Sequence, residues 1–130
     1  MKAYWDSSAL VESTIDLALQ QRLHAERGFA RPHVLAECSS ALTAGGLGVR
    51  MDADDAAKAL DNLSAHLDWV ELTPAEVLAA VKRAKKLGVR GGRVHDLMHA
   101  VAADKSGADE LLTVDRNDFI GLAKLPIAQV

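Results

Sequence analysis

The sequence of 130 residues has a single cysteine, Cys38, which excludes an internal disulfide framework. Such cysteine usage is typical of a reducing compartment, and we expect a cytoplasmic protein. No apolar run is long enough to span a bilayer, and Asp6 and Glu12 interrupt any N-terminal stretch that could act as a signal peptide. Aromatic residues make up only 4% of the chain, too few to predict base stacking as the main grip on a nucleic acid.

Basic residues are not in excess, since the formal net charge is −3, but their distribution is uneven. Six of the fifteen lie between residues 82 and 93, where there is no acid: Lys82, Arg83, Lys85, Lys86, Arg90 and Arg93. Such a run indicates either a solvated helix face or a local contact for phosphates. The pattern alone leaves both interpretations open.

Short apolar segments alternate with helical patterns along one expected domain, residues 1–130. Strands are predicted at residues 2–5, 29–30, 67–72, 110–114 and 127–130. Helices are predicted over residues 14–27, 33–44, 53–63, 74–87 and 95–105. Two helix starts carry capping-box signals, Ser13 with Asp16 and Thr73 with Glu76. The alternation predicts an α/β fold with a mostly parallel central sheet.

Four acidic residues stand in unusual places. Asp6 and Asp115 each follow a predicted strand, so both should project from the same edge of a parallel sheet. Glu37 and Asp96 lie in helices that are otherwise apolar or built of small residues. Taken singly, each has an ordinary explanation as a helix-start acid, a turn residue or an exposed helical residue.

Together, the four carboxylates would repel one another if they converged, and a hard divalent cation is the usual compensation. Mg²⁺ and Mn²⁺ prefer oxygen ligands and are typically completed by water and substrate phosphates. Because Cys38 stands alone, no thiolate cluster competes for a metal. If the four acids converge, they therefore predict a site for Mg²⁺ or Mn²⁺.

The segments around these acids resemble the four acidic motifs of the PIN domain family, and most closely the VapC-type toxin ribonucleases. The resemblance covers nearly the whole chain in the same order. Its motifs are Asp6 in YWDSSALVE, Glu37 in RPHVLAECSSAL, Asp96 in VHDLMHAVAA and Asp115 in LLTVDRNDF.

The resemblance implies a three-layer α/β/α fold and a Mg²⁺- or Mn²⁺-dependent endoribonuclease that leaves 3′-hydroxyl and 5′-phosphate ends. It makes the quartet both catalytic and metal-binding, and it adds Asp118 as a further metal ligand. Supporting hydroxyls would be Ser7, Ser8 and Thr113. It also implies an RNA substrate, a homodimer and a cognate antitoxin, with no DNA substrate and no membrane.

Arg90 and Arg93 end the basic run just before Asp96, near the metal site that the acids predict. Local cations allow an acidic protein to hold RNA, because phosphate contacts drive sequence-independent affinity. We therefore expect these two arginines to contact RNA.

Two other functions compete with this hypothesis. The segment HDLMH places His95 and His99 four residues apart, as in the HExxH motif of zinc peptidases, but Asp96 stands where that motif needs a glutamate. His99 on an apolar helix is more typical of a packed core histidine. The second alternative is a PIN-like module that binds RNA or protein without cutting, which the presence of all four acids disfavours.

Overall fold

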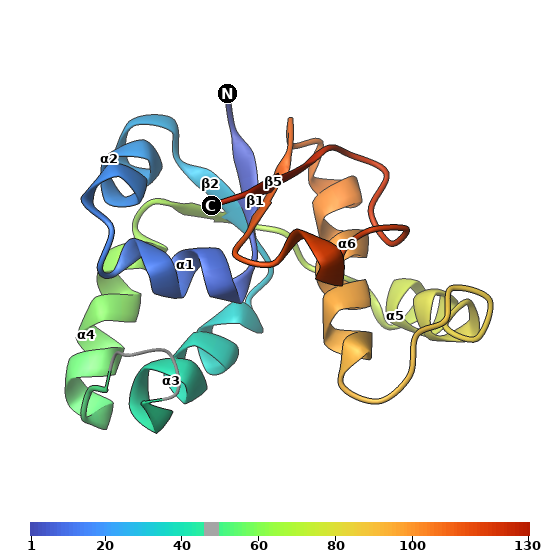
Figure 1. Ribbon diagram of the computed structural model, residues 1–130, viewed down its shortest axis with the longest axis horizontal. Helices are drawn as coiled ribbons and strands as arrows, with labels where there is room; N and C mark the ends of the chain where they lie inside the picture. The colour runs from blue at the N-terminus through green and yellow to red at the C-terminus, as the bar shows by residue number, and fades with distance from the viewer. Residues whose placement is uncertain (46–49) are drawn as a thin grey trace.

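The computed structural model describes residues 1–45 and 50–130. It contains a sheet of five short strands: Ala3–Trp5 (β1), Gly28–Ala30 (β2), Leu67–Trp69 (β3), Leu111–Thr113 (β4) and Ile127–Gln129 (β5). Their order is β3-β2-β1-β4-β5, and every neighbouring pair is parallel (Figure 1). The predicted parallel sheet is confirmed. Because all strands run the same way, their carboxyl ends share one edge of the sheet.

In the described parts of the chain, six α-helices and one 3₁₀ turn connect and cover the strands. They are α1 (Ser7–Ser13), α2 (Leu17–Glu26), α3 (Val34–Ala44), α4 (Ala53–Ser64), α5 (Pro74–Lys82), α6 (Arg93–Ser106) and the 3₁₀ turn η1 (Arg116–Asp118). Helices α1 to α4 lie on one side of the sheet and α5 and α6 on the other (Figure 1). Within residues 1–45 and 50–130, none of the helices has the length and apolar character that a membrane crossing requires.

The alternation of side chains along β1 explains the layering. Ala3 and Trp5 are buried among residues of α1 to α4, whereas Tyr4 is buried with alanines of α6. Successive side chains of a strand point to opposite faces, so a strand that is apolar throughout needs helices on both sides. This confirms the expected α/β/α architecture.

The helix starts agree with the sequence patterns in two cases and differ in a third. Thr73 forms the predicted capping box at α5, and Asp52 caps α4. The predicted capping box at Ser13 is wrong, because Ser13 ends α1 and its hydroxyl donates to the Leu10 carbonyl at 2.6 Å. Asp16 caps α2 instead. A serine hydroxyl can bond to the backbone of the helix before it or to that of the helix after it, and the Ser13 hydroxyl bonds to the preceding helix.

Several predicted elements are longer than the observed ones, as three examples show. The strand expected over residues 67–72 ends at Trp69, and the helix expected over residues 74–87 ends at Lys82. Turns follow up to Gly88, which has a positive φ of 71°. The strand expected over residues 110–114 spans only Leu111–Thr113.

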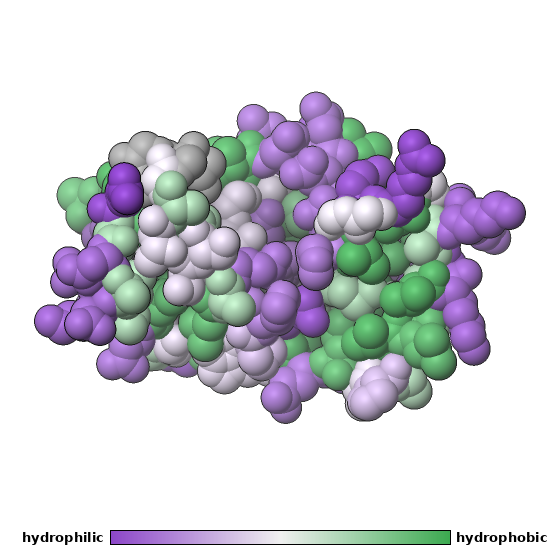
Figure 2. Space-filling view, turned by 90° about the horizontal axis from the view of Figure 1, so that it is seen from below, coloured by the Kyte–Doolittle hydropathy of each residue, from purple (hydrophilic) through white to green (hydrophobic). Residues whose placement is uncertain are grey.

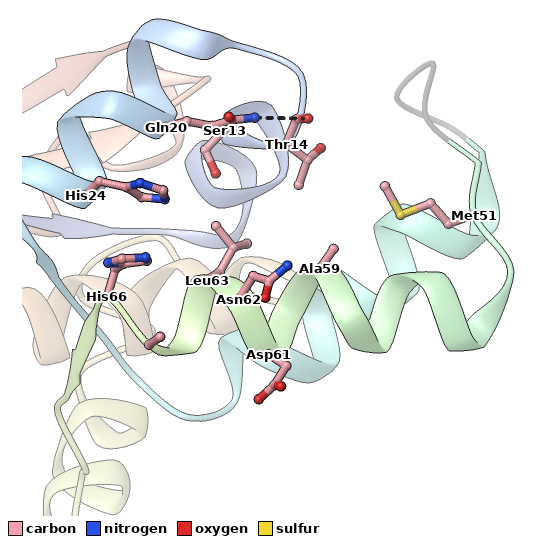
Figure 3. A pocket seen from close by; sticks show the side chains of 11 residues that line it. Ser13, Thr14, Gln20, His24, Met51, Ala59, Asp61, Asn62, Leu63 and His66 are labelled. Carbon is pink, nitrogen blue, oxygen red and sulfur yellow. Dashed lines mark hydrogen bonds between the residues drawn. The ribbon is translucent and has the colours of Figure 1, made fainter.

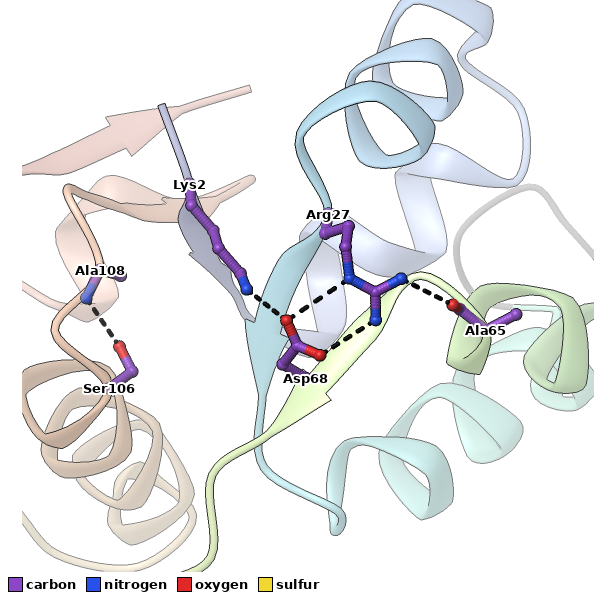
Figure 4. Close-up of polar contacts among 6 residues, drawn as sticks. All are labelled: Lys2, Arg27, Ala65, Asp68, Ser106 and Ala108. Carbon is purple, nitrogen blue, oxygen red and sulfur yellow. Dashed lines mark hydrogen bonds and ion pairs between the residues drawn. The ribbon is translucent and has the colours of Figure 1, made fainter.

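Ion pairs connect β3, one of the two edge strands of the sheet, to neighbouring residues. The Asp68 carboxylate pairs with Lys2, and it accepts a hydrogen bond from Arg27 Nη2 at 3.0 Å (Figure 4). These two cations hold the pKa of Asp68 down at about 2, mainly through the hydrogen bonds that they donate. The Lys2 ammonium also lies 4.1 Å from the centre of the Phe29 ring. Charged side chains make an edge strand such as β3 a poor template for the addition of another strand.

Gly28 provides a test of the packing around β1. A Cβ atom at this position would lie 2.5 Å from Trp5 Cδ1 and 2.6 Å from Trp5 Nε1. Because the Trp5 side chain is completely buried, it has little room to move. We expect Gly28→Ala to lower the free energy of unfolding by about 1–3 kcal/mol, as measured by urea denaturation.

Gly92→Ala is the matched control for this prediction, because a Cβ atom there would meet nothing within 4 Å and the backbone is already helical, with φ −60°. Its stability should change by less than about 0.5 kcal/mol. Equal stability of the two variants would contradict the close packing of Trp5 on Gly28.

Candidate active site

Asp6 is positioned by the end of β1 and the start of α1. Its Oδ1 atom accepts hydrogen bonds from the Ala9 amide at 2.8 Å and from the Ser8 hydroxyl at 2.7 Å. The side chain is 5% exposed, and burial raises the pKa of Asp6 although Thr113, Ala9 and Ser8 act in the opposite direction. Asp6 therefore caps a helix and also presents a buried carboxylate that is costly to ionise.

Hydroxyl groups connect Asp6 to the end of β4. Ser8 Oγ lies 3.2 Å from Thr113 Oγ1 and accepts a hydrogen bond from the Val114 amide at 3.0 Å. Ser7 differs, because in the described residues it is the Ser7 backbone carbonyl, and not its hydroxyl, that forms a hydrogen bond. This carbonyl accepts from the Cys38 thiol at 3.6 Å. Burial raises the pKa of Cys38 to about 12, so this thiol stays protonated. Of the three hydroxyls that the resemblance implies as supporting groups, those of Ser8 and Thr113 lie beside Asp6.

Asp96 lies in the first turn of α6 and is half-buried. Its pKa is raised to about 6 by burial and then by the charges of Asp118 and Asp6, while His99 and Arg93 lower it. Two other carboxylates are therefore close enough to disfavour its ionisation. We refer to Asp6, Asp96 and Asp118 as the acid cluster.

Asp115 and Asp118 belong to the same 3₁₀ turn but are placed differently. Asp115 is exposed and caps η1, accepting a hydrogen bond from the Asn117 amide at 3.0 Å. Asp118 is half-buried and acts electrostatically on Asp96. Arg93 Nη2 donates to the Asp118 carbonyl at 3.1 Å, which links η1 to the start of α6. Of the two acids in this turn, Asp118 is the one that the structure brings to the cluster.

Glu37 reaches the site from α3 and is bound by a histidine of α6. His99 Nε2 lies 2.7 Å from Glu37 Oε1, and His99 Nδ1 lies 2.7 Å from the Tyr4 hydroxyl. Burial tends to raise the pKa of Glu37, but the hydrogen bond and charge of His99, with His33 and Arg31, lower it below its usual value. The carboxylate is thus held in its ionised form.

The roles of His99 and Tyr4 were missed in the sequence. The available signal was the HDLMH segment, which puts His99 one turn after Asp96 on the same helical face. The expectation of a packed core histidine is confirmed by its 2% exposure, but both ring nitrogens also have polar partners.

Cationic and aromatic side chains border the acids. The rings of His33 and His95, from the starts of α3 and α6, lie 5.9 Å apart with an interplanar angle of 20°. Arg31 follows β2 and lines a small cavity of about 180 Å³ with His33. Arg93 is close enough to lower the pKa of Asp96. Positive charge is therefore available around the cluster, partly from residues that the sequence did not single out.

Arg90 is not part of this group in the described residues. It lines a separate cavity of about 370 Å³ with Lys85, Gly88 and Val89, in the connection between α5 and α6. The structure thus places Arg93 beside the acids, whereas Arg90, three residues earlier, lines a separate cavity.

The arrangement of the acidic side chains decides which metal ions the site suits. Among the residues that the structure describes, no three His, Cys, Asp or Glu side chains are gathered to hold one ion, so the expected ligands are not arranged as a preformed cage. Mg²⁺ is commonly held by one or two carboxylates, with water and substrate phosphates completing the shell. Crowded carboxylates with a raised pKa suit such an ion.

A zinc peptidase site needs three direct protein ligands, and the HDLMH segment does not supply them in the described structure. His99 uses both ring nitrogens for Tyr4 and Glu37, and His95 stacks on His33. The geometry therefore disfavours the zinc alternative.

The surface around the acids is polar. Figure 2 views the edge of the sheet where the strands end and shows hydrophilic side chains in its middle, between more apolar regions. A larger cavity, of about 600 Å³, lies elsewhere, between α1, α2 and α4 (Figure 3). His24 and His66 stack there with ring centres 4.0 Å apart, and none of the acid cluster lines it. The larger cavity is therefore separate from the acid cluster.

Comparison with known proteins identifies the family and the fold of the chain. A family model described as PIN domain matches residues 3–125. The fold is similar to PAE2754 from Pyrobaculum aerophilum, with 18% identity, a TM-score of 0.69, and coverage of 98% of this chain and 89% of that one. It is also similar to VapBC2 from Rickettsia felis bound to a DNA fragment from their promoter, with 15% identity, a TM-score of 0.71, and coverage of 100% and 99%. No curated protein shows significant sequence similarity.

Proposed function

The chain belongs to the PIN domain family, and from that membership we propose that it is a Mg²⁺- or Mn²⁺-dependent endoribonuclease. The observation that supports the proposal is the acid cluster at the carboxyl edge of the sheet, where burial, and then the charges of Asp118 and Asp6, raise the pKa of Asp96. Carboxylates crowded in this way favour a bound divalent cation, whose coordination shell the phosphates of a substrate can complete.

The residues of the site would have different roles in binding the cation. Asp6, Asp96 and Asp118 would hold the cation, with Glu37 and Asp115 as further ligands in line with the family motifs. Ser8 and Thr113 hold Asp6 in position, and Arg93 fixes η1 through the Asp118 carbonyl. The bound ion would lower the pKa of a coordinated water and neutralise charge on the phosphoryl group.

A cleavage assay on total cellular RNA tests this function. Cleavage is expected with Mg²⁺ or Mn²⁺ and should disappear with EDTA, and sequencing of the cut ends would identify the target. Calorimetric titration with Mn²⁺ separates the alternatives. Metal binding without cleavage of any RNA would favour a silent PIN-like module, and neither binding nor cleavage would overturn the proposal.

Arg90 and Arg93 are proposed to contact the RNA backbone. We expect the double variant Arg90→Gln/Arg93→Gln to bind single-stranded RNA more weakly and to reduce the slope of log affinity against log salt by about 1–2, because each phosphate contact adds roughly one unit or less. Fluorescence anisotropy in EDTA measures binding without cleavage.

Lys58→Gln is the control for these arginines, since it removes one exposed positive charge from α4, on the other side of the sheet. An unchanged salt slope in the arginine double variant would mean that the basic run is only a solvated surface.

The biological setting is also a proposal. We propose a cytoplasmic toxin that pairs with a cognate antitoxin and forms a homodimer, in line with the resemblance to VapC-type proteins. Exposed apolar side chains support a protein-binding surface, with Leu78 54% and Val81 45% exposed on α5. The fold is similar to that of VapBC2 from Rickettsia felis.

A further inference from the structure

His99 occupies the point where the two helical layers meet over the edge of the sheet. Its helix, α6, covers one face, whereas Glu37 belongs to α3 on the opposite face. The contact of 2.7 Å between His99 Nε2 and Glu37 Oε1 therefore bridges the layers. Asp96 lies three residues earlier on α6, so the same face of this helix serves both Glu37 and the acid cluster.

The direction of the hydrogen bond follows from the groups involved. An ionised carboxylate can only accept hydrogen bonds, so His99 Nε2 must carry the proton and donate it to Glu37. When the ring is neutral, Nδ1 is then an acceptor, and the Tyr4 hydroxyl 2.7 Å away is placed to donate to it. Tyr4 is fully buried, which keeps its hydroxyl protonated. Tyr4 thereby selects the form of the ring that binds Glu37.

We propose that His99 is a positioning residue that, held by Tyr4, fixes the Glu37 carboxylate for the metal-binding cluster. This inference rests on the proposed function, because it assumes that the cluster holds a divalent cation. Only Oε1 of Glu37 has a hydrogen-bond partner within residues 1–45 and 50–130, which leaves Oε2 for an ion or its water. Groups that orient metal ligands in this way change metal affinity even though they do not touch the ion.

Mn²⁺ titration by calorimetry tests the inference on the full chain without RNA. His99→Phe keeps an aromatic ring but removes the donor, and we expect Mn²⁺ affinity to fall about 10- to 100-fold. His99→Gln retains an amide donor and should recover most of the affinity. Tyr4→Phe removes only the hydroxyl, so a smaller loss of about 2- to 10-fold is expected.

A double-mutant cycle distinguishes positioning from a general packing defect. Once Glu37→Ala has removed the carboxylate, adding Tyr4→Phe should cause no further loss of Mn²⁺ affinity. Met98→Leu, a volume-conserving change of a buried neighbour on α6, is the matched control and should leave the affinity unchanged. If His99→Phe does not fold, Tyr4→Phe and this cycle decide the question.

The possible failures can be told apart. Wild-type Mn²⁺ affinity in His99→Phe, or additive losses in the cycle, would overturn the role of His99 while wild-type cleavage leaves the proposed function standing. Absence of both Mn²⁺ binding and RNA cleavage in the wild type would overturn the proposed function and this inference with it. Restoration of cleavage in Tyr4→Phe by excess Mn²⁺ would support positioning.

Discussion

Asp6→Asn is expected to reduce metal-dependent RNA cleavage on the order of 10³-fold, because losing a buried ligand removes several kcal/mol of transition-state stabilisation and each 1.4 kcal/mol corresponds to a factor of ten. The fold should survive. Asparagine is as good a helix cap as aspartate, and its Oδ1 can still accept from the Ala9 amide and the Ser8 hydroxyl. The substitution also removes the cost of ionising a buried carboxyl group in the metal-free protein.

Cleavage of total RNA and thermal melting, followed by circular dichroism, measure the two halves of this prediction. The matched control is Asp52→Asn, which makes the same change at the cap of α4, where the side chain accepts from the Asp55 amide at 2.8 Å. That variant should cut RNA like the wild type. Full cleavage by Asp6→Asn would remove Asp6 from the catalytic set, and equal loss in both variants would indicate a general effect of altered caps.

The contrast between Asp6 and Asp52 shows what the sequence could predict. Both residues read as helix caps, and both cap helices in the structure. Only Asp6 follows an apolar strand, and parallel strands bring such positions to a common edge. The rule therefore predicted the meeting of the β1 and β4 ends, where Ser8 Oγ lies 3.2 Å from Thr113 Oγ1.

The rest of the site depends on contacts that periodicity does not report. An apolar pattern shows which face of α6 is buried, but it cannot show that His99 meets Tyr4 and Glu37, which are 95 and 62 residues away in sequence. Likewise, two acids three residues apart look alike in the sequence. The 3₁₀ turn leaves Asp115 exposed and Asp118 half-buried, near enough for its charge to raise the pKa of Asp96.

Asp96→Asn is expected to stabilise the metal-free protein above pH 7 while abolishing most of its metal binding. The pKa of Asp96 is about 6 in the fold, above the ordinary 3.8, because burial and the charges of Asp118 and Asp6 disfavour the ionised form. The stabilisation that the neutral form provides is therefore fully present below about pH 4 and is lost as the pH rises through about 6. Because the side chain is only half-buried, the gain in Asp96→Asn at pH 8 should be about 1 kcal/mol.

Divalent metal should reverse this order of stability. The wild type should gain about 2.7 kcal/mol at a Mg²⁺ concentration 100 times its Kd, whereas Asp96→Asn, which lacks the ligand, should gain little. Urea denaturation between pH 4.5 and 8, in EDTA and in Mg²⁺, measures both effects. Asp61→Asn on α4 is the control, since Asp61 is exposed and has no hydrogen bond or ion pair in the described structure.

Stability measured in EDTA and in Mg²⁺ shows whether the crowded carboxylates of the acid cluster act as metal ligands. A carboxylate that serves as a metal ligand is expected to be costly to ionise without metal and to stabilise the fold when metal is bound. A structural acid such as Asp52 stabilises the fold in both conditions. If Asp96→Asn were less stable than the wild type at pH 8 in EDTA, Asp96 would be acting as a helix-start acid. If Mg²⁺ stabilised the variant as much as the wild type, the acid cluster would not be the metal site.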